Sequence, residues 1–293
     1  MKGLFSRNGR VLPYRRAMVS ALDRGFLYGD SAYETLRSYE GRPFLFREHW
    51  RRLRASCAQL GISFPWKRDA QEAFVVGLLK RARLKSAHVR IIVTRGEGAI
   101  RMAPERGLRP NLMYYVQLFT PLPASLYRRG AAVALVSLRR NPIESLDPRI
   151  KSSNLLNNVL ASIQAGRRRA LEALMLNSAG DLVEGASSNL FLVRHGAVLT
   201  PPLSEGLLSG ITRAIVFRIA RREKIEIRER VLGERALRHC DEAFITSTLK
   251  EILPVRSCNG RLLGNGRPGP VTLRLGCAFQ RFRDQWICRA SGR

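Results

Sequence analysis

The stretch Leu146–Ala161, LDPRIKSSNLLNNVLA, places a single lysine between an extended segment and a helix. Pro148 and Ile150 favour extended backbone before Lys151. Serine and asparagine follow as helix-capping residue types, and apolar residues then recur at helical spacing. A lysine fixed from both sides can point inward, as a lysine that attacks a carbonyl must. On pattern alone, an ordinary surface lysine beside a helix start is the more common case.

The chain is strongly basic. Its 293 residues carry 51 Lys and Arg against 23 Asp and Glu, a formal net charge of +28. This charge raises the hypothesis of a nucleic-acid-binding protein. However, the arginines are scattered in short groups such as Arg167–Arg169, as on solvated helix faces, and no zinc-finger spacing or RNP-type motif is present. A noncatalytic nucleic-acid-binding protein is therefore a remote alternative, and no specific nucleic acid is expected as a partner.

Cysteine usage and hydropathy indicate the cellular location of the protein. Five cysteines without a CxxC pair predict neither a disulfide framework nor a metal site. The N-terminal residues lack the apolar run of a secretory signal, and no segment approaches the ~18 apolar residues that span a bilayer. We expect a cytoplasmic protein that does not interact with membranes.

Strand-like and helix-like segments mix in both halves of the chain, which predicts an α+β (mixed α/β) fold in two domains. Pro121–Pro123 is the best candidate for a break. We predict an N-terminal α/β domain over residues 1–120, a linker over 121–130 and a C-terminal domain over 131–293. The periodicity predicts helices over residues 47–60, 68–83, 206–222 and 270–286.

Five separated motifs lie between residues 23 and 255, within a resemblance that covers about residues 23–275. They are DRGFLYGDSAYETLR, EHWRRL, KSSNLLNNVLA, LVEGASSNLF with LLSGITR, and ITSTLKEILPV. Together they resemble the class IV (fold type IV) pyridoxal-phosphate-dependent aminotransferases, a family of branched-chain aminotransferases, D-amino acid aminotransferases and 4-amino-4-deoxychorismate lyase. The resemblance implies a homodimer with pyridoxal 5′-phosphate as cofactor. It also implies a smaller N-terminal α/β domain and a larger, barrel-like C-terminal domain that binds the cofactor.

The resemblance assigns cofactor roles to residues within the motifs. Lys151 resembles the lysine that holds the cofactor as a Schiff base and then moves a proton between Cα and C4′. Glu184 matches the carboxylate that binds the pyridine nitrogen, and Arg52 matches the phosphate-binding arginine. The other predicted cofactor contacts are helix-start amides, hydroxyls and one amide side chain: Asn189, Gly210, Ile211, Thr212, Ser247 and Thr248.

The substrate side is less sharply predicted. The candidates are one tyrosine, one threonine and three arginines: Tyr33, Thr35, Arg37, Arg90 and Arg101. Arg90 stands where similar branched-chain enzymes have the arginine of a YIRP segment, although here His88 and Ile91 replace the tyrosine and proline. Arg101 lies in a loop near the position where D-amino acid enzymes and the lyase have a carboxylate-binding arginine. The spacing is one residue longer here, and Ala103 occupies the histidine position of the RxH arrangement of the D-amino acid enzymes.

The expected reaction moves an amino group between an amino acid, branched-chain-like or D-configured, and a 2-oxo acid. It would proceed by a ping-pong mechanism through the Lys151 Schiff base. Thr35 falls where the lyase has a functional threonine, so formation of 4-aminobenzoate and pyruvate by a lyase is the alternative. KSSNLLNNVLA resembles the corresponding segment of the transaminases and of only some lyases, and we therefore favour the transaminase.

Overall fold

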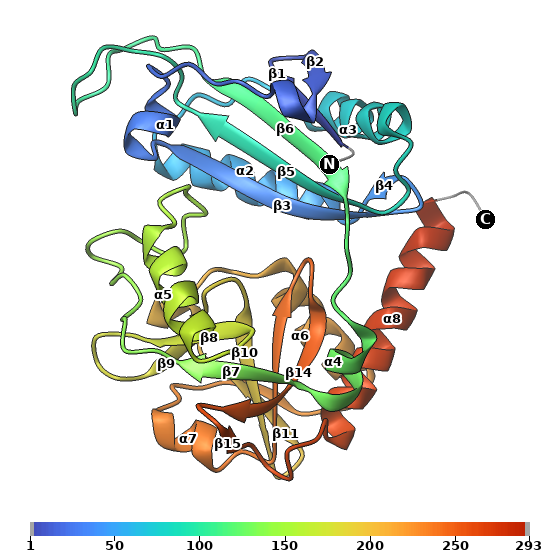
Figure 1. The fold of residues 1–293 in the computed structure, drawn as a ribbon. Coiled ribbons are helices and arrows are strands. Elements are labelled where there is room, and N and C mark those ends of the chain that lie inside the picture. The colour runs from blue at the N-terminus through green and yellow to red at the C-terminus, as the bar shows by residue number, and fades with distance from the viewer. Residues whose placement is uncertain (1–2, 291–293) are drawn as a thin grey trace. The chain divides into compact units, whose positions relative to one another are not determined.

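The computed structural model describes residues 3–290, which form two compact units (Figure 1). Within this range the first unit extends to Thr120 and also includes Ile150–Asn154. The second unit comprises Pro121–Arg149 and continues from Leu155. Lys151 therefore belongs to the first unit, although the chain on both sides of it belongs to the second. The sequence prediction did not include this excursion of five residues.

The described part of the first unit is built on an antiparallel sheet with the strand order β2-β1-β6-β5-β3-β4. Its strands are β1 (Gly3–Arg7), β2 (Arg10–Pro13), β3 (Ser31–Tyr39), β4 (Arg42–Pro43), β5 (Ala87–Thr94) and β6 (Asn111–Leu118). Residues alternate between the two faces, so Val89, Ile91 and Val93 are fully buried whereas His88 and Arg90 face the other way. The sheet thus has a core face and an open face.

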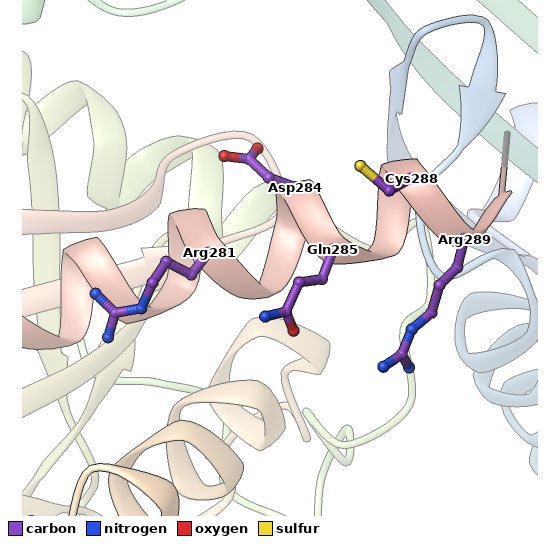
Figure 2. A pocket seen from close by; sticks show the side chains of 5 residues that line it. All are labelled: Arg281, Asp284, Gln285, Cys288 and Arg289. Carbon is purple, nitrogen blue, oxygen red and sulfur yellow. The ribbon is translucent and has the colours of Figure 1, made fainter. Parts of the chain in front are cut away.

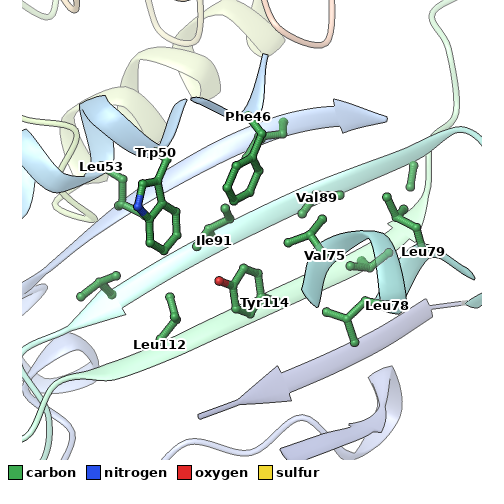
Figure 3. Close-up of a cluster of buried hydrophobic side chains, with 14 of the residues drawn as sticks. Phe46, Trp50, Leu53, Val75, Leu78, Leu79, Val89, Ile91, Leu112 and Tyr114 are labelled. Atoms are coloured by element: carbon green, nitrogen blue, oxygen red, sulfur yellow. The ribbon is translucent and has the colours of Figure 1, made fainter. Parts of the chain in front are cut away.

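Two helices cover the core face (Figure 1). The helices of the first unit are α1 (Arg24–Tyr28), α2 (Phe46–Gln59) and α3 (Arg68–Ala82), and the predicted helices over 47–60 and 68–83 are confirmed as α2 and α3. Figure 3 shows the core, in which side chains of both helices meet those of β5 and β6: Phe46, Trp50, Leu53, Val75, Leu78, Leu79, Val89, Ile91, Leu112 and Tyr114. Each large apolar side chain buried here contributes about 1.5–3 kcal/mol.

The second unit is built on a sheet that closes on itself. Its strands are β7 (Ala131–Leu135), β8 (Glu172–Leu176), β9 (Leu182–Gly185), β10 (Asn189–Arg194), β11 (Ala197–Thr200), β12 (Ile227–Glu229), β13 (Glu242–Ser247), β14 (Glu251–Cys258) and β15 (Arg261–Leu262). Because β9 pairs with both β8 and β10, the path β9-β10-β13-β14-β7-β8 returns to its start. Apolar residues such as Leu174, Leu190 and Ile245 fill the core. The barrel-like sheet expected for the C-terminal part is present.

The helices of the second unit are α4 (Ala124–Arg129), α5 (Leu156–Arg167), α6 (Ile211–Arg222), α7 (Glu234–Arg238) and α8 (Pro270–Ala290). The start of the helix predicted over 206–222 is wrong, because Gly210 is still extended with φ −66° and ψ 134°. Helix α4 lies in the predicted linker, and its Leu126 and Tyr127 pack against the barrel core. Within residues 3–290, no helix combines the length and apolar character that crossing a membrane requires.

Candidate active site

The backbone of Lys151 is held from two sides within the first unit. The Tyr33 N–H donates to the Lys151 carbonyl at 2.9 Å, and the Ser153 N–H donates to the Ser31 carbonyl at 2.9 Å. The Lys151 N–H in turn donates to the buried hydroxyl of Ser56 on α2 at 3.1 Å. The segment therefore continues the sheet beside β3, as the extended approach to Lys151 suggested. Helix α5 begins only at Leu156.

Two cations flank one aromatic ring on the open face. The Lys151 Nζ lies 4.4 Å from the centre of the Tyr33 ring, and the Arg90 guanidinium carbon lies 4.0 Å from it. Thr35 is the cross-strand partner of Arg90. Neither Lys151 nor Arg90 forms an ion pair with any residue that the structure describes. Positive charge thus gathers around Tyr33 without an ion-pair partner among residues 3–290, and an anionic ligand would offset it.

Glu34 lies on the core face and is fully buried. Its carboxylate accepts hydrogen bonds from Arg52 Nε at 2.6 Å, from Arg52 Nη2 at 2.9 Å and from His49 Nδ1 at 2.7 Å. Burial raises the pKa of Glu34, but the charge of Arg52, followed by His49 and the hydrogen bonds, holds this pKa well below its ordinary value. Burial lowers the pKa of His49 against the opposing pull of Glu34, so a neutral imidazole that donates from Nδ1 fits the contact.

Arg52 is the predicted phosphate ligand, and its side chain is only 15% exposed. His49, Arg52 and Ser56 lie on one face of α2, since residues three and four positions apart share a helix face. The same helix face thus holds the Glu34 carboxylate and the backbone of Lys151. The motifs contained Glu34 and His49, but sequence reasoning assigned them no role; strand alternation was the available signal that Glu34 turns inward.

In the second unit, Glu184 on β9 is a buried carboxylate with several donors around it. Arg140 Nε donates to Oε1 at 3.0 Å, the Leu208 N–H donates to Oε2 at 3.1 Å and Asn189 Nδ2 reaches Oε2 at 3.4 Å. The buried arginine favours the ionised carboxylate, which the predicted contact with a protonated pyridine nitrogen needs. Sequence reasoning missed Arg140, which lies 44 positions before Glu184.

A glycine makes room for the Asn189 side chain. A Cβ at Gly210 would collide with Asn189 Oδ1. Asn189 Nδ2 also donates to the Leu208 carbonyl at 3.0 Å, so the asparagine links β10 to the segment before α6. Gly210 caps α6, and the backbone amides of Ile211 and Thr212 begin this helix. The structure thus brings five of the predicted cofactor residues together: Glu184, Asn189, Gly210, Ile211 and Thr212. Backbone amides at the start of a helix suit a phosphate.

Ser247 and Thr248 lie at the turn between β13 and β14, and β13 is the neighbour of β10. The Ser247 hydroxyl accepts from the Lys250 N–H at 3.1 Å. The Lys250 ammonium donates to Ser187 Oγ at 2.6 Å and pairs with Glu172 at 2.8 Å. Lys250 thereby ties this turn to the segment that follows Glu184, a contact that sequence reasoning missed.

The remaining candidate arginines have other partners. Arg37 shares the open face with Tyr33 and Thr35, and its guanidinium carbon lies 4.1 Å from the centre of the Phe119 ring. Arg101 is 55% exposed along its side chain and pairs with Glu105 at 3.0 Å. Arg101 therefore contacts Glu105, whereas Arg90 and Lys151 are the cations at the Tyr33 ring.

An open hollow lies along α8 (Figure 2). Arg281, Gln285 and Arg289 point to one side of the helix, and Asp284 and Cys288 point to the other. Arg281 also donates to Glu223 at 2.6 Å. None of these residues belongs to the five motifs, and we assign the hollow no role.

The fold, a sheet-and-helix unit and a unit with a barrel-like sheet, is that of the fold type IV pyridoxal-phosphate enzymes. Residues 31–258 match the model of the family described as amino-transferase class IV. The chain belongs to this family, and it is an aminotransferase by class.

Individual relatives cover almost the whole chain. A protein of Methanocaldococcus jannaschii, provisionally named branched-chain-amino-acid aminotransferase, is 37% identical over 279 residues, which are 95% of this chain and 96% of that protein. D-alanine aminotransferase of Bacillus licheniformis is 31% identical over 280 residues, 96% of each chain. The solved structure of the Escherichia coli branched-chain amino acid aminotransferase matches with a TM-score of 0.91 at 30% identity, over 95% of this chain and 94% of that one.

The family and fold class inferred from the five motifs are therefore confirmed. The relatives carry both branched-chain and D-alanine names, so they do not single out one substrate. All three are named aminotransferases, and the lyase alternative is not favoured. Two further branched-chain enzymes of this fold, with TM-scores of 0.90 and 0.86, were solved with pyridoxamine 5′-phosphate and in the pyridoxal-phosphate form, which supports pyridoxal phosphate as the cofactor.

Proposed function

We propose that the chain is a pyridoxal-phosphate-dependent transaminase that moves an amino group from a branched-chain or D-amino acid to a 2-oxo acid in two half-reactions. The single observation that carries this proposal is the pair of cations at Tyr33, Lys151 and Arg90, without an acidic partner among residues 3–290. Lys151 carries a primary amine, which in its neutral form can bond covalently to an aldehyde. The other cation, Arg90, is a fixed guanidinium, which suits a carboxylate.

Lys151 is the residue that would hold the cofactor, through its Nζ. When bound, pyridoxal 5′-phosphate supplies the aldehyde that takes up the amino group and the ring that withdraws electrons. The same Lys151 amine would move a proton at the substrate Cα. The backbone hydrogen bonds of Lys151 to Tyr33 and Ser56 support this role, because they fix the Cα from which the side chain projects.

Glu184 would accept a hydrogen bond from the pyridine nitrogen and keep that nitrogen protonated. Its contact with Arg140 supports this role, since it holds the carboxylate in the ionised form. Arg52 would bind the phosphate through charge-assisted hydrogen bonds. In the second unit, the amides of Ile211 and Thr212 and the hydroxyls at the β13–β14 turn are the candidates for a phosphate contact. The room that Gly210 leaves for Asn189 supports the fit of this residue set to the cofactor.

Arg90 would orient the substrate by its carboxylate. The guanidinium is anchored over the Tyr33 ring, and Thr35 lies opposite it on β3. Anchoring by a cation–π contact limits the rotamers that the arginine must give up on binding. Arg37 and Arg101 stay candidates for a second contact.

We propose a homodimer in which α5 lies at the interface. Four apolar residues of this helix recur at i, i+3, i+4 and i+7 and are 44–69% exposed: Leu156, Val159, Leu160 and Ile163. Residues 155–166 contain no charged side chain, in a chain with a net charge of +28. Two such copies repel one another over most of their surface, so an uncharged apolar face is where they can associate.

The oligomeric state can be tested by light scattering. Leu160→Glu is expected to give a monomer, because it buries a charge in the interface. Leu273→Glu on α8 changes a residue of similar exposure, 49%, and is expected to leave the dimer intact. A monomeric unsubstituted protein, or dissociation by both variants alike, would contradict the proposal.

The reaction itself is tested by offering single L- and D-amino acids to the cofactor-loaded protein without an acceptor. At least one donor should release a 2-oxo acid in an amount equal to the active subunits, and turnover should resume only when a second 2-oxo acid is added. 4-Amino-4-deoxychorismate serves as the control substrate. Release of pyruvate and 4-aminobenzoate from it, with no response to any amino acid, would favour the lyase. The cytoplasmic location stays a prediction, which cell fractionation would test.

A further inference from the structure

Glu34 is a buried carboxylate that the proposed cofactor and substrate contacts do not use. It lies between Tyr33 and Thr35, whose side chains turn to the open face, whereas Glu34 turns to the core face. It is 0% exposed in a core of apolar side chains. Removing a carboxylate from water is unfavourable, and an apolar side chain of similar size would fill such a position with less desolvation. The carboxylate is therefore expected to serve a purpose beyond packing.

The contacts of Glu34 converge on Arg52. The Arg52 Nε and Nη2 atoms donate to the two carboxylate oxygens at 2.6 and 2.9 Å, which is a bidentate arrangement. His49 donates to Oε2 at 2.7 Å. Because His49 and Arg52 are three positions apart on α2, one helix face meets Glu34 at two points. His49 holds one oxygen of the carboxylate, and the carboxylate holds the guanidinium through two hydrogen bonds.

We propose that Glu34 is a positioning residue, which orients the Arg52 guanidinium for the phosphate group of the cofactor. The proposal rests on the phosphate-binding role proposed for Arg52. A guanidinium is a rigid fork, so the edge that faces Glu34 sets the direction of the opposite edge. An arginine already held in one rotamer loses less conformational entropy when an anion binds. The negative charge of Glu34 also allows Arg52 to be 85% buried, out of the solvent that would compete for its donors.

A purely structural role makes a different prediction. If Glu34 served only to pair a buried arginine and histidine, its loss would weaken the first unit and lower all cofactor affinity alike. If Glu34 acts through Arg52, its loss affects the phosphate-dependent part of binding. Pyridoxal 5′-phosphate and pyridoxal differ only in the phosphate group, so the ratio of their dissociation constants isolates that part.

The test is a titration of the apoprotein with pyridoxal 5′-phosphate and with pyridoxal, followed by absorbance. Glu34→Gln keeps the size of the side chain but removes the charge and one acceptor. We expect a dissociation constant for pyridoxal 5′-phosphate about 10- to 100-fold higher, the range for losing a charge-assisted hydrogen bond, with the constant for pyridoxal changed less than about twofold. Equal weakening of both ligands, or no change in either, would overturn the proposal.

Ser38→Ala is the matched control. Ser38 is 0% exposed on the same strand and face, and its hydroxyl contacts Lys85 and Ala87 rather than Arg52. It should lower stability without changing the ratio of the two dissociation constants. If Glu34→Gln does not fold, His49→Gln removes one support of the carboxylate and is expected to change the ratio in the same direction by a smaller factor. An unchanged ratio in His49→Gln would then overturn the proposal.

Arg52→Lys separates this proposal from the one on which it rests. It should raise the ratio, and the double variant Glu34→Gln with Arg52→Lys should raise it no further, since Glu34 acts through Arg52. If Arg52→Lys leaves the ratio unchanged, the phosphate role of Arg52 fails and the positioning role fails with it. If Arg52→Lys raises the ratio but Glu34→Gln does not, or if the two effects multiply, only the role of Glu34 is overturned.

Discussion

Lys151 and Lys250 are two of the seven lysines in the chain, and the structure gives them opposite surroundings. The Lys250 side chain is 16% exposed, pairs with Glu172 at 2.8 Å and donates to Ser187 at 2.6 Å. The Lys151 Nζ faces the ring of Tyr33 and has no carboxylate partner among residues 3–290. An acidic partner stabilises a charged ammonium, whereas a nucleophilic amine must be neutral. The comparison indicates that Lys250 holds two turns together and that Lys151 is the lysine available for chemistry.

The largest expected effect separates these two lysines. Lys151→Ala should lower kcat by at least about 10²- to 10⁴-fold, the contribution of a positioned acid–base group. Lys250→Met should retain measurable turnover but lower Tm, because it leaves the buried Glu172 without its cation. A coupled assay of 2-oxo acid formation and a thermal melt of both variants check this pair. Equal loss of turnover in the two variants would break the comparison.

Arg90 and Arg101 form the next contrast. Arg90→Met should raise KM for the amino acid about 10- to 100-fold, since a hydrogen bond between charged groups contributes about 1.5–3 kcal/mol. Arg101→Met should change KM by less than about threefold, because exposed ion pairs such as that with Glu105 contribute little. Steady-state kinetics with one donor decides between them. The opposite ranking would transfer the carboxylate-binding role to Arg101.

Gly210→Ala should weaken the binding of pyridoxal 5′-phosphate. The added methyl group would displace Asn189 from the carboxylate of Glu184 and cost about 1–3 kcal/mol in lost contacts. Gly276→Ala on α8 is the control, because a Cβ there meets nothing within 4 Å and should stabilise the helix by about 0.5–1 kcal/mol. Cofactor titration and urea unfolding measure both effects. A Gly210→Ala variant with unchanged affinity would remove the support that this glycine gives to the cofactor site.

The smallest expected effect is the pH dependence of stability. The pKa values of Glu34 and His49 both lie below their ordinary values of 4.5 and 6.5 in the folded chain. As the pH falls, Glu34 and His49 therefore take up protons in the unfolded chain before they do so in the folded chain, and the free energy of unfolding decreases. The loss should begin below about pH 6.5 through His49 and deepen below about pH 4.5 through Glu34. Urea unfolding at about pH 8, 5 and 3 should show both steps, and Glu34→Gln should lose the second.

Local pattern predicted much of the fold. The helices α2 and α3, the strands around β5 and β13, and the extended approach to Lys151 all follow from periodicity and from turn residues. The excursion of Ile150–Asn154 into the first unit did not follow, because its hydrogen bonds to β3 join residues more than a hundred positions apart. Local periodicity carries no information about such pairing.

The residues of the candidate site likewise fall into those that the sequence predicted and those that only the structure shows. The motifs pointed to Lys151, Arg52 and Glu184, but the partners that hold the last two, Glu34 and Arg140, came only from the structure. A charged residue in a strand or loop is usually solvated, and its burial depends on a donor supplied from elsewhere in the chain. Lys250 was missed for the same reason.

The most direct test of the account is the identity of the lysine that carries the cofactor. The protein loaded with pyridoxal 5′-phosphate is reduced with borohydride, which makes a lysine–cofactor bond permanent, and its peptides are mapped by mass spectrometry. We predict one modified peptide, with the added mass on Lys151 and none on Lys250. Modification of Lys250 or of another lysine in place of Lys151, or no modification at all, would contradict the account.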